Sequence, residues 1–584
     1  MTPRRTGFRV SMNVPIPLRD GTLTYADVYR PAGTGRHPVI LERTPYGKGE
    51  VQYGLTQIDL LRAMARGYAV VVQDCRGRFT SRGEFHPFVQ ETDDGYDSIE
   101  WCAAQRWADG NVGMIGQSYV GATQLLAATA KPPHLRCVVP CVTSSDYYEG
   151  WTYQGGALQW GFVSTWALSL AAEALVNGRG RVGDRPAARA RLVRMADHPC
   201  SAWSTLPLRE LPIVAELAPY FLEWLDHPSR DEYWRRISIS ERHEEIRVPA
   251  LNVSGWYDIF RDGTLGNFAG LRARGGSAEA RTGTRLLMGP WEHEAPGHQK
   301  VGIVNFGMEA GHGPNPLNFD QYSAYFDFFD RWLMGESRPR LSDPPVRLYV
   351  MGEGWRDESE WPLARTRHEH LFLRSTGRAG TVAGDGRLST KEPVGERPDS
   401  FVYDPSRPVP TRGGQNCCQL PDLPAGPFDQ SEIERRDDVL VYDTEPLKTD
   451  LEVTGPVVLR LWAATNGPDT DFTAKLVDVS SDGMALNLTD GIIRGRYRET
   501  TALPTLLTPG LPTEFSIAVG STSRVFRAGH RIRLEVSSSN FPRFDRNHNT
   551  EEDFSRDVTL RPAHQTIFHD VDRPSHLVLP VIPR

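Results

Sequence analysis

The sequence predicts an α/β domain that is interrupted by a helical insertion and followed by an all-β domain. Apolar runs typical of buried strands alternate with helical segments up to about residue 140 and again from about residue 248. The segment between them has helical character and many tryptophans, whereas strand-like runs without helices, separated by Gly, Pro, Asn and Asp, follow residue 343. We place the first part of the α/β domain at residues 1–144, the insertion at 145–244, the second part at 245–342 and a β-sandwich of jelly-roll type at 343–584.

Four runs in the first part of the α/β domain have the character of buried parallel strands. They are short, apolar and bounded by turns, and they occupy residues 38–43, 68–74, 113–117 and 135–140. The third run leads into an expected helix over residues 122–130. Because parallel strands end at one edge of a sheet, where ligands bind, residues that follow these runs are candidates for a functional site.

Ser118 lies between the third run and its helix. A tight strand-to-helix turn lifts a serine hydroxyl above the sheet, and the helix N-terminus favours negative charge there. Val120 occupies a position where the usual GxSxG pattern has glycine, and Gly121 follows one residue later. By itself this motif is equally compatible with a connection whose glycines serve packing.

Two later strand ends supply an acid and a base. Residues 248–257 run into Asp258, and residues 285–292 run into His293. The order Ser, Asp, His is the α/β-hydrolase order, and three such strand ends converge on one crevice. The sequence therefore predicts a serine hydrolase of the α/β-hydrolase fold.

Tyr46 follows the first strand, where its phenol could donate to an oxyanion beside the backbone N–H of Tyr119. A tyrosine in such a loop is otherwise half-buried packing. We treat both tyrosines as candidates for the oxyanion hole.

Five segments together resemble the cocaine-esterase branch of the CocE/NonD hydrolases, which are related to X-prolyl dipeptidyl peptidases and α-amino acid ester hydrolases. They are residues 43–46, 73–77, 116–121, 255–258 and 289–293, with 408–414 and 453–457 resembling the C-terminal domain of that family. The resemblance implies Ser118 as nucleophile, His293 as base and Asp258 as its orienting acid, with Tyr46 and the Tyr119 amide as oxyanion hole. It also implies that the jelly roll packs on the catalytic domain, where the loop at 415–418 would reach the pocket.

The insertion is expected to cover the site as a cap whose apolar lining shapes a substrate pocket. Trp151 and Trp166 are predicted to face the site, because residues 151–158 resemble the pocket segment of cocaine esterases. Gln57 and Phe260 are further substrate-binding candidates carried over from the resemblance. Alternatively, the tryptophans fill the core of the insertion.

Composition fits a multi-domain enzyme with a small-molecule substrate. The net charge of −7 argues against a nucleic-acid partner, and no apolar run reaches the roughly 20 residues of a membrane span. The basic N-terminal segment lacks the apolar core of a secretory signal, so we expect a cytoplasmic protein. Homo-oligomerisation is left open.

We expect neither a metal nor an organic cofactor. His293 and His298 are five residues apart with Pro296 and Gly297 between them, so they do not share a helical face. The seven cysteines show no CxxC pair, only Cys417 and Cys418 are adjacent, and most should be buried thiols.

The predicted reaction is ester hydrolysis through an acyl-enzyme. Because Asp258 is followed by Ile259 and Phe260 rather than by acidic residues, an uncharged and possibly aromatic acyl group is expected. An X-prolyl dipeptidyl peptidase or a β-lactam acylase is the alternative, with Glu149 as the nearby candidate to bind a free N-terminus. An inactive carbohydrate-binding protein is a more distant alternative.

Overall fold

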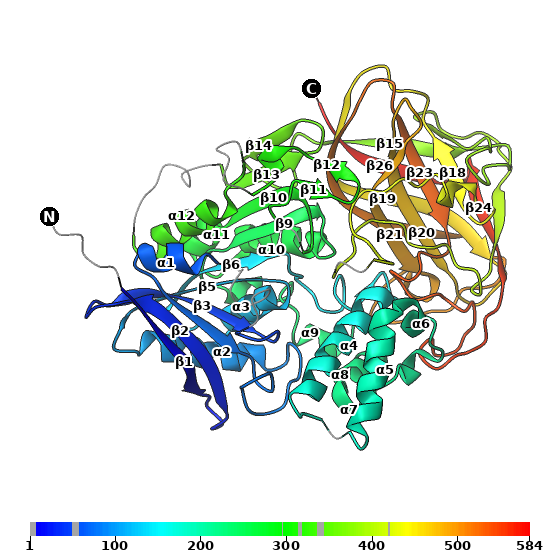
Figure 1. The fold of residues 1–584 in the computed structure, drawn as a ribbon. Coiled ribbons are helices and arrows are strands. Elements are labelled where there is room, and N and C mark those ends of the chain that lie inside the picture. The colour runs from blue at the N-terminus through cyan, green and yellow to red at the C-terminus, as the bar shows by residue number, and fades with distance from the viewer. Residues whose placement is uncertain are drawn as a thin grey trace.

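The computed structural model describes residues 7–49, 58–180, 182–294, 296–312, 318–335, 344–418 and 421–583. It has an α/β domain (blue to green in Figure 1), a helical insertion in cyan and an all-β domain in yellow to red. The predicted fold class is confirmed. No helix of the described ranges is long and apolar enough to cross a membrane.

The α/β domain is built on a ten-stranded sheet in the order β1-β2-β4-β3-β5-β6-β9-β10-β13-β14. Strands β4, β3, β5, β6, β9, β10 and β13 pair in parallel, and antiparallel strands flank them on both sides. The strands are β1 (Phe8–Pro17), β2 (Leu23–Pro31), β3 (His37–Thr44), β4 (Ala69–Asp74), β5 (Ala108–Gln117), β6 (Leu135–Cys141), β9 (Leu251–Tyr257), β10 (Arg285–Glu292), β13 (Val346–Val350) and β14 (Gly354–Glu358).

Helices cover both faces of this sheet, which is why every residue of β4 is buried. Helices α2 (Glu91–Ala103), α3 (Tyr119–Thr129) and α10 (Arg261–Arg274) contribute to the core on one face. Helices α1 (Leu60–Ala65) and α12 (Gln321–Leu333) contribute to the core on the other. A short helix α11 (Ala278–Gly283) precedes β10, and a small hairpin, β11 (Lys300–Val301) and β12 (Val304–Asn305), follows it.

The insertion lies between β6 and β9. It opens with a short hairpin, β7 (Tyr153–Gln154) and β8 (Ala157–Leu158), and continues as helices. These are α4 (Trp160–Val176), α5 (Arg185–Asp197), α6 (Pro199–Trp203), α7 (Val214–Leu217), α8 (Tyr220–Asp226) and α9 (Glu232–Arg235). Hydrogen bonds from Gly161 N to the Pro542 carbonyl (2.7 Å) and from Leu158 N to Asp545 Oδ1 (2.8 Å) join it to the all-β domain.

The all-β domain begins at β15, and its longest strands, β19 and β22, pair antiparallel. Its strands are β15 (Arg367–Arg374), β16 (Arg387–Ser389), β17 (Asp399–Tyr403), β18 (Leu440–Asp443), β19 (Leu451–Thr465), β20 (Asp471–Val479), β21 (Ala485–Arg494), β22 (Thr513–Phe526), β23 (Arg531–Ser537), β24 (Ala563–Asp570), β25 (Arg573–Pro574) and β26 (His576–Ile582). The main hydrophobic core of this domain extends to Met288 of β10 and Val350 of β13.

One strand differs from its predicted assignment. The prediction places residues 346–351 in the β-sandwich, whereas β13 pairs in parallel with β10, Leu286 opposite Val346, and so extends the sheet of the α/β domain. An apolar strand has the same sequence pattern in a β-sandwich and in an α/β sheet. Here the open edge of β10 determines which strand it pairs with.

Candidate active site

Ser118 sits on a strained turn between β5 and α3. Its backbone adopts φ 60° and ψ −125°, outside the common regions for a residue with a side chain. The turn is held by the amide of Ser118, which donates to the Cys141 carbonyl at 2.9 Å, and by the amides of Gly121 and Ala122, which donate to the Ser118 carbonyl. The predicted strand, turn and helix are confirmed, and strain of this kind is typical of functional sites.

Close packing explains the glycines around the turn. A Cβ on Gly116 would lie 2.1 Å from Val120 Cγ1, and a Cβ on Gly121 would lie 2.7 Å from Thr143 Cβ. The side chain of Val120 therefore packs against Gly116 at the position where the usual motif has glycine, and the second required glycine is Gly121. The departure from GxSxG leaves the turn intact.

Asp258 and His293 meet at the carboxyl ends of neighbouring parallel strands, β9 and β10. Asp258 Oδ1 lies 2.8 Å from His293 Nδ1, and its Oδ2 accepts from Ser254 Oγ at 2.6 Å. The Phe260 amide also donates to Oδ1, at 3.1 Å. Both members of the pair are buried. The carboxylate thus fixes the imidazole so that Nε2 is the nitrogen available for chemistry.

The surroundings of His293 shift its pKa upward. Burial lowers the pKa, but the hydrogen bond and negative charge of Asp258, with the charges of Glu294 and Glu292, outweigh burial and raise it above its ordinary value. Burial raises the pKa of Glu292 to about 7. A histidine held this way is a stronger base than a free imidazole.

Tyr119, the residue after the serine, is anchored by a buried network. Its hydroxyl donates to Glu91 Oε1 and accepts from the Phe88 amide, both at 2.9 Å, and Glu91 Oε2 lies 2.7 Å from Arg43 Nη1. Sequence reasoning missed Glu91, because nothing in its own segment indicates a partner on the neighbouring helix. The network fixes the backbone of Tyr119 at the N-terminus of α3.

Tyr46 follows β3, and its hydroxyl oxygen accepts from Trp166 Nε1 at 3.0 Å. An oxygen that accepts from the indole keeps its own hydrogen as a donor. Trp166 also stacks on Tyr119, with ring centroids 5.9 Å apart. Trp166 of the insertion therefore contacts both residues that are candidates for the oxyanion hole.

Three of the predicted pocket residues, Trp151, Trp166 and Phe260, form a buried aromatic cluster beside His293. Trp151 stacks on Phe260 with centroids 4.3 Å apart, and Phe260 meets the His293 ring edge-on at 5.0 Å. Trp166 lies edge-on to Trp151 at 6.1 Å. Phe162 completes the group against Trp151 and was not predicted. The remaining pocket prediction, Gln57, lies outside the described residues.

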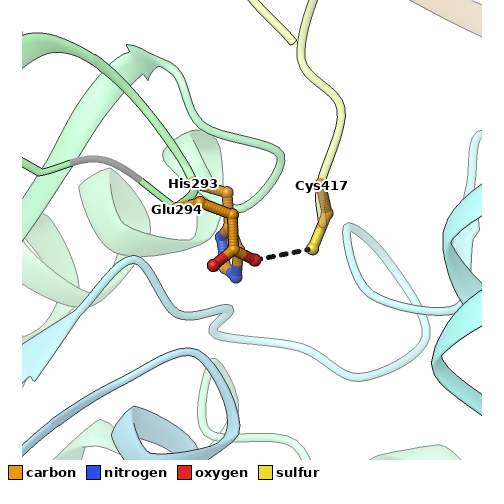
Figure 2. Close-up of side chains that lie close together, drawn as sticks. All are labelled: His293, Glu294 and Cys417. Carbon is orange, nitrogen blue, oxygen red and sulfur yellow. Dashed lines mark hydrogen bonds between the residues drawn. The ribbon is translucent and has the colours of Figure 1, made fainter. Parts of the chain in front are cut away.

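A loop of the all-β domain reaches the base. Cys417 Sγ lies 3.9 Å from Glu294 Oε1, next to His293 (Figure 2). Cys417 and Cys418 are joined in a disulfide that the sequence did not predict, whereas four of the five free cysteines are buried, as expected. The all-β domain therefore contributes directly to the surroundings of the site.

A cavity of about 800 Å³ lies between α10, the insertion and the all-β domain, and its lining does not include Ser118, Asp258 or His293. Glu149 lines it; its carboxylate accepts from the Gly155 amide and is surrounded by protein yet open to the cavity. Burial raises the pKa of Glu149 to about 7. We take the strand-end site as the centre of chemistry, because within the described residues it brings a strained serine turn and a paired histidine to one edge of the sheet.

Two family models and a curated relative match this chain. Residues 20–295 match the X-Pro dipeptidyl-peptidase (S15) family, and residues 341–578 match the X-Pro dipeptidyl-peptidase C-terminal non-catalytic domain. The chain is 41% identical to a cocaine esterase from Rhodococcus sp. (strain MB1 Bresler), with 99% of each chain covered.

Two solved structures are similar over the whole chain. An aminopeptidase from a marine sediment archaeon, Thaumarchaeota archaeon, has a TM-score of 0.79 at 26% identity, covering 100% of this chain and 98% of that one. An α-amino acid ester hydrolase has a TM-score of 0.77 at 26% identity, covering 100% and 99%.

Proposed function

The chain belongs to the CocE/NonD family of serine hydrolases and is an ester-cleaving enzyme, and from that premise we propose which residues carry its reaction. Ser118 is the nucleophile, His293 the general base and Asp258 its orienting acid. The Tyr46 hydroxyl and the Tyr119 backbone N–H form the oxyanion hole.

In the first half-reaction His293 Nε2 takes the Ser118 proton while Oγ bonds to the ester carbonyl carbon. The carbonyl oxygen becomes an oxyanion, which accepts from the Tyr46 hydroxyl and the Tyr119 N–H. Collapse breaks the bond to the leaving alcohol, to which His293 returns the proton. Water then repeats the sequence on the acyl-enzyme and releases the acid.

The observation that carries this proposal is the pairing of His293 with buried Asp258, at 2.8 Å, at the sheet edge where the strained Ser118 turn also lies. Asp258 receives two further hydrogen bonds and so holds one orientation. A preorganised acid stabilises the imidazolium that forms in each transition state.

The finer proposal concerns the acyl group. Trp151, Trp166 and Phe260 form a buried aromatic cluster that contacts His293 through Phe260, and Glu149 lines a cavity away from this cluster. An ammonium ion packed against these rings would lose its water, and the rings themselves offer it no carboxylate partner. We therefore infer a preference for uncharged acyl esters, aromatic ones included, as the name of the cocaine esterase relative suggests.

An X-prolyl dipeptidyl peptidase is the second candidate, because both family models carry that description; a β-lactam acylase remains a weaker alternative. We expect kcat/KM to be higher for a phenylacetyl ester than for the phenylglycyl ester with the same leaving group, since the two differ only in the amino group. A better rate on the phenylglycyl ester or on a Gly-Pro chromogenic amide would favour the peptidase instead, and Glu149→Gln would then be the first variant to make.

The nucleophile is tested with Ser118→Ala on a p-nitrophenyl ester and with fluorophosphonate labelling located by mass spectrometry. Turnover and labelling should both disappear. Ser145→Ala is the matched control, because Ser145 is also buried and its hydroxyl has no hydrogen-bond partner among the described residues. Retention of more than a few per cent of the rate in Ser118→Ala would exclude the assigned nucleophile.

A cytoplasmic location is part of the proposal; the buried free thiols Cys75, Cys102, Cys137 and Cys141 support it, whereas the Cys417–Cys418 disulfide does not. Such thiols persist in reducing compartments. Cell fractionation tests the location, and size-exclusion chromatography measures whether the chain associates with itself.

A further inference from the structure

Three side chains of metal-ligating type gather beside the base. His293, Glu294 and Cys417 each place one potential ligand atom within 4.8 Å of the other two (Figure 2). They come from two domains, since His293 and Glu294 follow β10 and Cys417 lies on the loop from the all-β domain. Nitrogen, oxygen and sulfur ligands together are a set that zinc accepts.

The spacing is close to what a zinc ion needs. Bonds of about 2.0–2.3 Å in a tetrahedron place ligand atoms about 3.5 Å apart. The Cys417 Sγ to Glu294 Oε1 distance is already 3.9 Å, and the widest pair needs to close by only about 1 Å.

A carboxylate that would orient the histidine ligand is also in place. His293 Nδ1 is bound to Asp258, which leaves Nε2 as the ligand atom in the carboxylate–histidine arrangement found at zinc sites. Glu294 itself is half-buried, so the cluster is not sealed from solvent.

The disulfide controls whether sulfur can take part. In the Cys417–Cys418 disulfide neither sulfur carries the negative charge that makes a thiolate a zinc ligand. Two-electron reduction by a dithiol converts this disulfide to two thiols and the reagent to its own disulfide. Cys417 can then lose its proton to solvent as it binds the metal.

We propose that reduction of Cys417–Cys418 creates an inhibitory zinc site composed of His293 Nε2, Glu294 and Cys417 Sγ. Zinc on Nε2 removes the lone pair that accepts the Ser118 proton, so the bound enzyme is inactive. The oxidised enzyme lacks the sulfur ligand and stays active at the same zinc concentration. The loss of activity rests on the proposed role of His293, whereas metal binding does not.

Adjacent cysteines supply a matched pair of variants. Cys418→Ser keeps Cys417 as a permanent thiol, and Cys417→Ser removes the ligand but keeps one thiol next to it. Wild type is compared as the oxidised enzyme and after reduction with dithiothreitol followed by anaerobic desalting. Each protein is titrated with zinc chloride, with ester hydrolysis as one readout.

Cobalt(II) binding is the second readout, because a cobalt–thiolate bond gives a near-ultraviolet charge-transfer band without any catalysis. Reduced wild type and Cys418→Ser should show the band and lose activity with zinc. Oxidised wild type should do neither. Cys417→Ser should bind zinc about 100-fold more weakly, since even the loss of a group that only orients a metal ligand costs about 10–100-fold.

Equal zinc sensitivity in all four proteins, or no cobalt–thiolate band in reduced wild type, would overturn the site. A band together with unchanged activity would retain the metal site and instead contradict the assignment of His293 as base. Glu294→Gln in the Cys418→Ser background should weaken zinc binding and provides a check that does not depend on the cysteine pair.

Discussion

Replacing Tyr46 by phenylalanine removes one hydroxyl with two expected roles. The first is to donate to the oxyanion, and loss of one such donor costs about 2.7–4 kcal/mol in the transition state, or roughly 100–1,000-fold in kcat. The second is to accept from Trp166 Nε1 at 3.0 Å. Trp166 is only 5% exposed, so the stranded indole N–H should lower the free energy of unfolding by about 1–3 kcal/mol.

One set of variants distinguishes the loss of kcat from the loss of folding stability. Steady-state kinetics on a p-nitrophenyl ester should show the fall in kcat with little change in KM, because the hydroxyl serves the charged intermediate more than the neutral carbonyl. In Tyr46→Phe/Trp166→Phe the stranded donor is gone, so the stability loss caused by that donor should disappear while kcat stays low.

Tyr148→Phe is the control for a buried tyrosine hydroxyl, since Tyr148 donates to the Pro228 carbonyl at 2.9 Å within the insertion. It should lose stability without losing kcat. An unchanged kcat in Tyr46→Phe would refute the reasoning and leave Tyr46 as packing for Trp166.

Three further predictions follow from buried groups. Asp258 helps raise the pKa of His293, and the base must be neutral, so the acid limb of the kcat/KM profile should lie above pH 6.5 in wild type. In Asp258→Asn this limb should move to lower pH, with a large loss of kcat. A limb that does not move would be assigned to another group. Burial raises the pKa of Glu42 well above its ordinary value, and both carboxyl oxygens lack hydrogen-bond partners in the described part of the chain. The folded state therefore holds the neutral acid, and folding stability is lost as the pH rises from the pKa of the unfolded state through that of the folded state. Glu42→Met should therefore raise the free energy of unfolding by an amount that grows between about pH 5 and pH 7, at most about 1.4 kcal/mol per pH unit. A gain independent of pH in denaturation experiments would contradict this. Gly121→Ala places a Cβ 2.7 Å from a carbon of the loop after β6, so it should lower the free energy of unfolding by about 1–3 kcal/mol and displace the serine. In the control Gly266→Ala the new Cβ would meet its nearest neighbour at 3.9 Å, so stability and activity should be retained in unfolding and activity assays.

Local pattern was enough to place the serine, the acid and the histidine. Each follows an apolar run of strand length, and parallel strands end at one edge, so the order Ser118, Asp258, His293 already implies a common crevice. The helix after Ser118 and the helical insertion were also readable, since periodicity and turn residues are properties of contiguous sequence.

Contacts between distant segments were decided only by the tertiary structure. The partner of residues 346–350 depends on the free edge of β10, which no property of that strand encodes. Glu91 supports Tyr119, Trp166 supports Tyr46, and Glu149 lines a separate cavity, all through side chains that packing brings together.

The loop that carries Cys417 and Cys418 shows the same difference between what the sequence and the tertiary structure determine. Adjacency of Cys417 and Cys418 is plain in the sequence, but their bond and their position beside Glu294 require the all-β domain to be docked on the α/β domain. A sequence pattern constrains a residue's neighbours along the chain and the face of the element it occupies. The folded structure must bury all apolar faces together. Which of these faces pack against each other is therefore a property of the whole fold.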